Sequence, residues 1–172
     1  MIATIFTIGG YGSTAQTFFG CLQHHGVDLL VDIRQRRGMR GGAYSFLNSL
    51  ALQEELRSRN IGYLHLKELA PTGEVRDLQR NSDRNSGAGK RGRVRLSEGF
   101  KSAYQAKIIG GCDDKEIFCR LEPYRRVCFF CVEGPADACH RSLVAKWGSE
   151  KLGVPVINIA PGVLCCNNRS EE

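Results

Sequence analysis

Long hydrophobic runs are missing from this sequence of 172 residues. No apolar stretch approaches the ~20 residues that a membrane-spanning helix needs, so we expect no membrane partner. The opening stretch, MIATIFTIGG, lacks the basic segment and the cleavage site of a signal peptide, and we interpret it as a first strand of a cytoplasmic protein. Internal repeats are also missing. The length then predicts one domain over residues 1–164, followed by a tail at 165–172.

The features of a secreted disulfide scaffold are lacking as well, although the chain has eight cysteines. Such a scaffold would be shorter and would follow a signal peptide. Cys21, Cys119 and Cys128 lie in apolar patterns, where a reduced cysteine behaves as a small hydrophobic residue. We therefore expect most of the cysteines to be reduced and structural, with Cys165 and Cys166 in the tail.

Positive charge is in excess, with a formal net charge of +6, and it is concentrated in two segments. Residues 34–40 hold four Arg and no acidic residue, and residues 76–95 hold seven Arg or Lys and two Asp. Clusters of this kind suit phosphate-bearing partners, either nucleic acid or a nucleotide. For residues 76–95 the alternative is a solvated loop. We interpret this segment as a basic, irregular excursion from the domain.

Hydrophobic patterning alternates between strands and helices along the chain. Apolar runs predict strands at residues 3–8, 27–33, 61–66, 126–133 and 154–159. Helical spacing predicts helices between residues 13 and 26, at 45–60, at 140–153, and one or two across 96–124. Residues 70–95 are predicted to be irregular. The order predicts an α/β fold of three layers, Rossmann-like, with a mostly parallel sheet and helices on both faces.

Candidate site residues follow the predicted strands at their carboxyl ends. In open parallel sheets ligands bind beyond these ends, so we expect the residues to converge on one edge. The candidates are Gly9, Tyr11, Asp32, Arg34, Lys67, Glu68, Cys131, Glu133, Cys139, His140 and Arg141.

The triplet Cys139, His140 and Arg141 opens the last predicted helix. A helix N-terminus favours a thiolate, so Cys139 is a candidate nucleophile. The same position favours a bound anion. A third interpretation is purely structural, with Arg141 paired to a carboxylate such as Asp32 or Glu133. Glu133 is alternatively a general acid or base.

Two further motifs are weaker. Cys128 and Cys131 form a C-x2-C, but residues three apart on a strand face opposite sides, so we expect no zinc site there and no metal ligands. Cys131 remains a candidate redox partner of Cys139. The stretch GGYGS at 9–13 suggests phosphate binding but lacks the G-x-G-x-x-G spacing and the Walker lysine, and a tight turn is the alternative. No cofactor is implied.

Four segments carry a family resemblance: FTIGGYG, HHGVDLLVDIR, NIGYLHLKELAPTGEVRDL and FFCVEGPADACHRSLVA. In this order they resemble the uncharacterised prokaryotic domain-of-unknown-function family 488, over most of residues 5–150. The resemblance implies a single α/β domain and no established reaction. A weaker likeness in layout is to rhodanese domains. Their cysteine loop is short, however, and the stretch from Cys131 to Arg141 is longer, so their active loop cannot be carried over.

Our leading hypothesis is an enzyme that acts on a nucleotide or nucleic-acid substrate. The phosphate would lie near Gly9, Arg34 and Arg141, Glu133 and His140 would transfer protons, and Cys139 is the possible nucleophile. A thiol-dependent enzyme of sulfurtransferase or redox type, using Cys139 or Cys131, is one alternative. A non-enzymatic nucleic-acid-binding module is the other.

Overall fold

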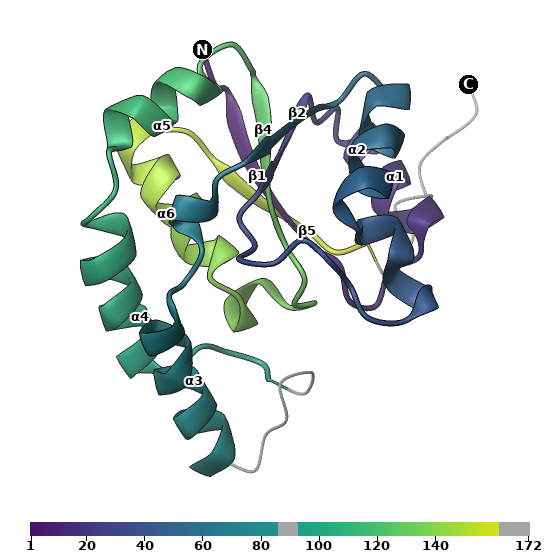
Figure 1. The fold of residues 1–172 in the computed structure, drawn as a ribbon. Coiled ribbons are helices and arrows are strands. Elements are labelled where there is room, and N and C mark those ends of the chain that lie inside the picture. The colour runs from purple at the N-terminus through teal and green to yellow at the C-terminus, as the bar shows by residue number, and fades with distance from the viewer. Residues whose placement is uncertain (86–92, 162–172) are drawn as a thin grey trace, which may run out of the picture.

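A parallel sheet organises the protein (Figure 1). The computed structural model describes residues 1–85 and 93–161. Within them, five strands lie in the order β3-β2-β4-β1-β5, and every pairing is parallel. The strands are β1 (Thr4–Gly9), β2 (Leu29–Asp32), β3 (Gly62–His65), β4 (Arg126–Cys131) and β5 (Val156–Ile159). All of the strand predictions are confirmed, with ends that differ by at most two residues.

Helices cover both faces of the sheet, as Figure 1 shows. One face carries α1 (Ala15–His24) and α2 (Ser49–Ser58), and the short turn η1 (Gly42–Leu47) precedes α2. The other face carries α4 (Glu98–Tyr104), the π-helical turn η3 (Gln105–Ile109), α5 (Asp114–Leu121) and α6 (Arg141–Leu152). The three-layer α/β prediction is therefore confirmed.

Alternation along the strands produces two hydrophobic cores. Phe129 packs in the core under α6, and its neighbour Phe130 packs in the core under α1 and α2. Both rings are fully buried, as burial of a central parallel strand on its two faces requires. The same alternation separates Cys128 from Cys131, which lie in different cores. The expectation that these two thiols face opposite sides is confirmed.

Capping residues mark the ends of the first and last helices. The Thr14 side chain caps α1 by accepting a hydrogen bond from the Thr17 amide, and Gly26 follows the helix with φ of 59°. At the other end of the chain, Gly153 closes α6 in the left-handed conformation, with φ of 66°.

The prediction of irregular structure across residues 70–95 is wrong for α3 (Gly73–Asn85). Only Val75 and Gln79 of this helix are buried, and its aliphatic residues are limited to Val75 and Leu78, so it lacks a continuous apolar face. Its three arginines are matched by three acidic residues, and the excess positive charge of the segment lies after the helix. Residues 86–92 lie outside the described residues, as do Cys165 and Cys166 of the tail.

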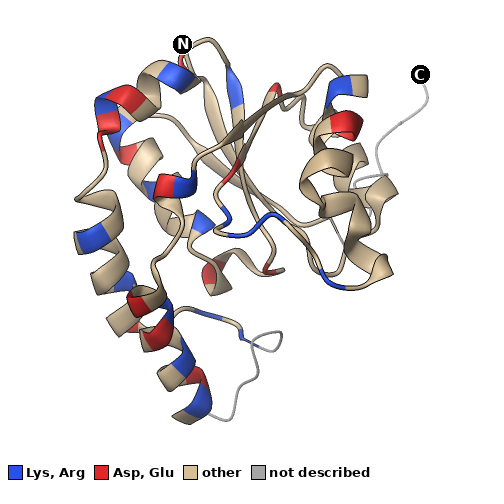
Figure 2. Cartoon of the chain, viewed as in Figure 1, with Lys and Arg blue, Asp and Glu red and all other residues tan. Residues whose placement is uncertain are grey.

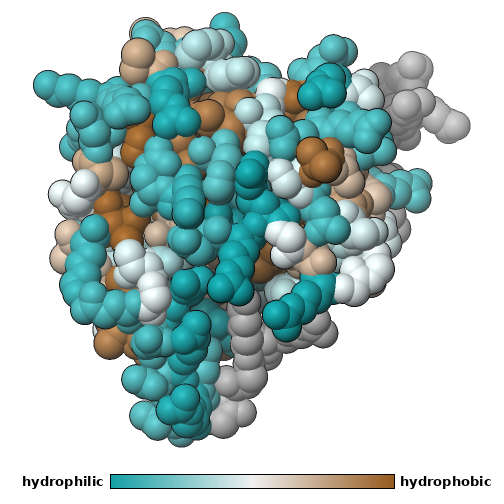
Figure 3. Space-filling model, viewed as in Figure 1, coloured by the Kyte–Doolittle hydropathy of each residue, from teal (hydrophilic) through white to brown (hydrophobic). Residues whose placement is uncertain are grey.

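No helix in the described part of the chain has the length and apolar character to cross a membrane. The surface seen in Figure 3 is largely hydrophilic over the lower part of the molecule, where α3 lies in Figure 1.

The order of the strands places a crevice at the end of β4. The chain leaves β1 and β2 toward the face that α1 and α2 cover, and it leaves β4 toward the opposite face through α6. Since β4 lies between β1 and β2, the connections diverge on both sides of its carboxyl end. Ligand sites in open α/β sheets form at such a divergence.

Candidate functional site

A cavity of about 510 Å³ lies at this carboxyl edge, within the size range of small-molecule sites. We call it the edge cavity. Its lining residues come from segments 34–39, 76–83 and 131–140, together with Tyr11, Pro71, Arg93, Leu96 and Phe100. Segment 34–39 follows β2, segment 131–140 follows β4, and segment 76–83 belongs to α3.

Arg34 lines the edge cavity and is held by Asp32. Its Nε lies 2.9 Å from Asp32 Oδ1 and its Nη2 lies 2.7 Å from Oδ2, while Tyr63 donates its hydroxyl to Oδ2 over 2.9 Å. The guanidinium also lies 4.6 Å from the ring centre of Phe130. Arg34 is 3% exposed, and its buried Nη1 has no hydrogen-bond partner in the described part of the chain. Asp32 is fully buried behind the cavity wall and holds Arg34 from there.

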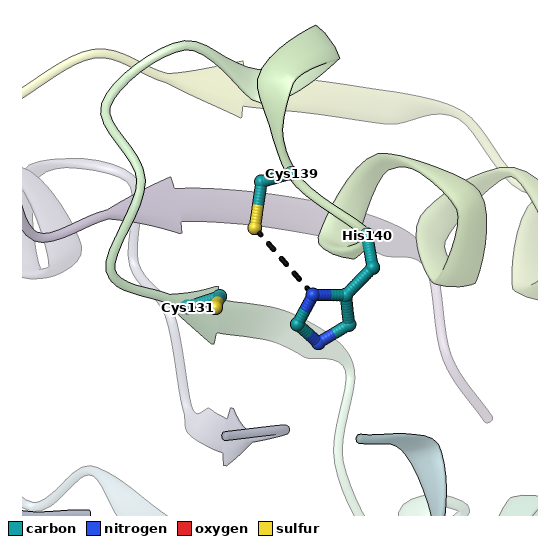
Figure 4. A group of neighbouring side chains, drawn as sticks. All are labelled: Cys131, Cys139 and His140. Carbon is teal, nitrogen blue, oxygen red and sulfur yellow. Dashed lines mark hydrogen bonds between the residues drawn. The ribbon is translucent and has the colours of Figure 1, made fainter. Parts of the chain in front are cut away.

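Cys131, Cys139 and His140 form a second group at the cavity (Figure 4). One ligand atom from each, a sulfur or an imidazole nitrogen, lies within 4.8 Å of the other two. Cys139 Sγ is 3.8 Å from His140 Nδ1. Both thiols donate to Glu133 Oε2, over 3.3 Å from Cys131 and 3.4 Å from Cys139. The end of β4 and the start of α6 thus bring together side chains eight or nine positions apart.

His140 is oriented from its other nitrogen. Its Nε2 lies 3.1 Å from the carbonyl oxygen of Ile33, directly after β2. Because a carbonyl only accepts, Nε2 carries a hydrogen. In the neutral imidazole the lone pair is then on Nδ1, which faces Cys139 Sγ.

The pKa values of these groups diverge. Burial acts to raise the pKa of Cys139, but the hydrogen bond from Cys131 and the charges of His140 and Arg141 hold it well below its ordinary value. The hydrogen bond with Cys139 and burial raise the pKa of Cys131 well above its ordinary value. Burial acts to lower the pKa of His140, but the adjacent Cys139 and Glu133 raise it. Of the two thiols, Cys139 is therefore the one that loses its proton more readily.

Arg141 supports the loop between β4 and α6. Its Nη1 donates to the carbonyl oxygen of Glu133 over 2.5 Å, and its Nη2 donates to that of Gly134 over 2.6 Å. The side chain is 1% exposed and does not line the edge cavity. Gly9 leaves room for this contact, because a Cβ there would lie 2.2 Å from the Glu133 oxygen. Both residues shape the loop from behind rather than face the cavity.

The stretch GGYGS forms a tight turn whose amides are already used. The amides of Gly10 and Tyr11 donate to the carbonyl oxygen of Val132, and the Ser13 amide donates to that of Gly10. Gly12 donates to the hydroxyl of Tyr44 over 3.1 Å. These amides are therefore occupied within the protein. Only Tyr11 of this stretch lines the edge cavity.

Lys67 and Glu68 lie away from the cavity, in the turn η2 (Lys67–Leu69). Glu68 accepts from Arg120 Nη1 over 3.0 Å, in an exposed ion pair. Of the predicted site residues, the structure brings Tyr11, Arg34, Cys131, Glu133, Cys139 and His140 to one cavity. It keeps Gly9, Asp32 and Arg141 behind that cavity and Lys67 and Glu68 outside it.

The wall formed by α3 was not anticipated. Arg76, Gln79, Arg80 and Asp83 line the edge cavity from this helix, and Arg93 joins them from the segment that follows. Gln79 is 4% exposed and accepts from the Ser97 amide over 2.8 Å, which ties α3 to the start of α4. The sequence signal for this wall was the spacing of Arg76, Gln79, Arg80 and Asp83, which places them on one helical face once a helix is assumed.

Comparisons with known proteins give a family. A family model described as "Domain of unknown function DUF488" matches residues 14–148, which is more than half of the chain and includes every member of the cysteine group. No curated protein and no solved structure matches the chain. From the extent of the family match, we conclude that this chain belongs to the DUF488 family.

Proposed function

We propose that the edge cavity is the active site of an enzyme that acts on a phosphate-bearing substrate, either a nucleotide or the end of a nucleic-acid strand. The observation that carries this proposal is the charge of the lining, which contains five arginines and two carboxylates. The volume of about 510 Å³ suits one nucleotide rather than a length of duplex.

Within the described residues, three of the five lining arginines form salt bridges and two do not. Arg34, Arg80 and Arg93 pair with Asp32, Asp77 and Asp83, respectively. No salt bridge to Arg36 or Arg76 is found among the described residues, and Arg76 Nε is buried without a hydrogen-bond partner there. Two uncompensated guanidinium groups beside one cavity favour a ligand with negative oxygens.

The distribution of charge in the fold supports the same conclusion. Figure 2 shows basic residues on the segment that follows β2, beside the carboxyl edge, and both signs of charge along α3. Among the described residues, Arg36 and Arg76 thus add positive charge at the cavity. Tyr11 supplies an aromatic ring to the lining, in edge contact with Tyr44 at 5.2 Å, and such a ring can contact a base.

Binding measurements test this proposal. Isothermal titration with the four nucleoside 5′-monophosphates should show binding that weakens with added salt, and the matching nucleosides should bind at least about tenfold more weakly, because they lack the charge-assisted hydrogen bonds. Arg36→Ala and Arg76→Ala should each weaken binding about tenfold. Arg57→Ala, an exposed arginine on α2, removes the same charge elsewhere and should leave affinity within about twofold.

Two results would oppose the proposal. Nucleosides that bind as well as nucleotides would remove the role of the phosphate. An Arg57→Ala variant that loses as much affinity as Arg76→Ala would show that only net charge matters. Mass spectrometry of the incubated phosphate esters reports on turnover, and binding without any product would favour a non-enzymatic module.

A second candidate function is a thiol-dependent enzyme of redox or sulfurtransferase type. The observation that favours it is the closeness of Cys131 and Cys139, whose thiols donate to the same oxygen of Glu133 at the edge cavity. Mild oxidation of the purified protein should then remove two hydrogens and join Cys131 to Cys139, which peptide mapping detects. Oxidation confined to other cysteines would exclude this candidate.

A further inference from the structure

We propose that Cys131, Cys139 and His140 bind a zinc ion, with a fourth coordination position open to the edge cavity. This site goes beyond the proposed function and stands independently of the substrate. Two thiolates and one imidazole form a ligand set that zinc prefers, and three protein ligands with one open position are typical of zinc sites that bind water or substrate.

The spacing of the three ligand atoms fits tetrahedral coordination. Zinc–sulfur bonds of about 2.3 Å and zinc–nitrogen bonds of about 2.1 Å at tetrahedral angles separate sulfur from nitrogen by about 3.6 Å and sulfur from sulfur by about 3.8 Å. Cys139 Sγ lies 3.8 Å from His140 Nδ1. All three atoms lie within 4.8 Å of one another, so closing on an ion requires shifts of about 1 Å or less.

The surroundings of His140 support coordination through Nδ1. Metal-binding histidines commonly donate their second ring nitrogen to a carbonyl oxygen, which fixes the orientation of the ring. His140 has this arrangement, since its Nε2 lies 3.1 Å from the Ile33 oxygen while Nδ1 faces the sulfurs. The imidazole is buried, with 6% exposure, so it cannot readily turn away from the two thiols.

The three proposed ligands lie at the ends of regular secondary structure, which holds them in place. Cys131 is the last residue of β4, the central strand, and His140 directly precedes α6. Arg141 binds the intervening loop through two carbonyl oxygens. Glu133 accepts from both thiols and is therefore placed to receive their hydrogen bonds before the ion binds. On binding, the two thiol protons pass to solvent and Nε2 of His140 keeps its hydrogen.

The proposed zinc site lies in the edge cavity, beside two arginines. All three ligands line the edge cavity together with Arg34 and Arg36. An ion with an open position would contact an oxygen of the anion that the arginines attract. Zinc in such a position polarises a bound oxygen or lowers the pKa of a bound water molecule.

Cobalt(II) titration of the chelator-treated, reduced protein tests this inference, because cobalt replaces zinc and reports thiolate ligands by absorption. The experiment uses the full chain with Cys165→Ser and Cys166→Ser, which removes two thiols outside the described residues. We expect one equivalent of cobalt to produce sulfur-to-metal charge-transfer absorption and visible bands of tetrahedral intensity, and zinc to abolish both. Absence of a saturable signal would overturn the inference.

Variants assign the ligands. Cys131→Ser, Cys139→Ser and His140→Gln should each lose the signal or shift its bands, while Cys119→Ser, an exposed thiol on α5, should bind as the parent protein does. Circular dichroism shows whether each variant is folded. An unchanged cobalt spectrum in folded Cys139→Ser would contradict the assignment. Zinc should also raise the melting temperature of the parent protein, and this readout needs no substitution in the site.

The test of the zinc site can be separated from the test of nucleotide binding. Nucleotide titrations run on the metal-free protein report the arginine lining alone. If the protein binds nucleotide but no metal, only the zinc site is refuted. If it binds metal but no nucleotide, only the phosphate site is refuted.

Discussion

His140 and Ile33 connect the segment after β2 to the start of α6, since the imidazole Nε2 lies 3.1 Å from the Ile33 carbonyl oxygen. Ile33 directly follows β2 and His140 directly precedes α6, 107 positions later in the chain. This contact fixes the ring beside Cys139 and places the cysteine group next to Arg34. Several consequences for stability, reactivity and binding can be measured.

Arg141→Ala should destabilise the protein by about 3 kcal/mol. The substitution removes two charge-assisted hydrogen bonds and leaves the carbonyl groups of Glu133 and Gly134 without this donor. Arg141→Lys should also be destabilising, because one ammonium group cannot reproduce the planar fork. Urea denaturation measures both, and Arg57→Ala should remain within about 0.5 kcal/mol of the parent protein. Parent-like stability of Arg141→Ala would show that the loop does not depend on this side chain.

Gly9→Ala should cost about 2 kcal/mol and weaken nucleotide binding. A Cβ at Gly9 would lie 2.2 Å from the Glu133 oxygen and 2.8 Å from the Gly134 oxygen, so the loop that carries the site must move. Gly20→Ala is the matched control, because a Cβ there meets nothing within 4 Å and α1 gains a better helix former. Thermal and urea unfolding should show the control to be as stable as the parent or slightly more stable. Equal effects of the two substitutions would argue against the close approach at Gly9.

Asp32→Asn should destabilise the protein by about 3 kcal/mol, because it leaves the guanidinium of Arg34 buried without a negative partner. Tyr63→Phe removes only the hydroxyl that donates to Asp32 and should cost about 1 kcal/mol. Denaturant titration of both variants gives the comparison. If Asp32→Asn were as stable as the parent protein, the ion pair would have no structural role.

Cys128 should resist alkylation in the folded protein while Cys119 reacts. Burial raises the pKa of Cys128 far above its ordinary value, so almost no thiolate forms at about pH 8, whereas Cys119 is exposed on α5. Iodoacetamide labelling followed by peptide mass spectrometry should modify Cys119 first and Cys128 only after denaturation. Equal native labelling rates would contradict the position of Cys128 in the core under α1 and α2.

Much of the fold could be predicted because its signals are local. The runs around Ile5, Val31 and Phe129 have the length and apolar character of buried strands, and Gly153 marks the end of α6. The convergence of Arg34 and His140 also followed from sequence order, since the carboxyl ends of parallel strands share an edge.

The parts that could not be predicted depend on tertiary contacts. Helix α3 buries only Val75 and Gln79 and has few apolar residues, so its amphipathic pattern is carried mainly by charged side chains, which a search for apolar spacing misses. The sequence indicated Cys131 as a partner of Cys139, but the approach of both sulfurs to His140 Nδ1 as three neighbouring ligand atoms depends on the path of the loop between them.

The hydrogen-bond partners of the GGYGS amides and of Arg141 could not be predicted from the sequence either. The amides of GGYGS are occupied by the β4 loop and by Tyr44, and Arg141 binds carbonyl groups of that loop rather than a carboxylate. A glycine-rich turn and an arginine at a helix start look the same in a sequence whether their partners are a ligand or the protein itself.

The most direct measurement of phosphate binding at the edge cavity is an amide NMR titration of the ¹⁵N-labelled protein with a nucleoside 5′-monophosphate. We expect saturable shifts at Arg34, Gln35 and Arg36 after β2, at Arg76 on α3, and at Cys139 and His140 before α6, and no comparable shifts along α2. The nucleoside without phosphate should leave these amides nearly unchanged. Shifts confined to residues outside the cavity, or no saturable shifts at low salt, would contradict a phosphate-binding site at this edge of the sheet.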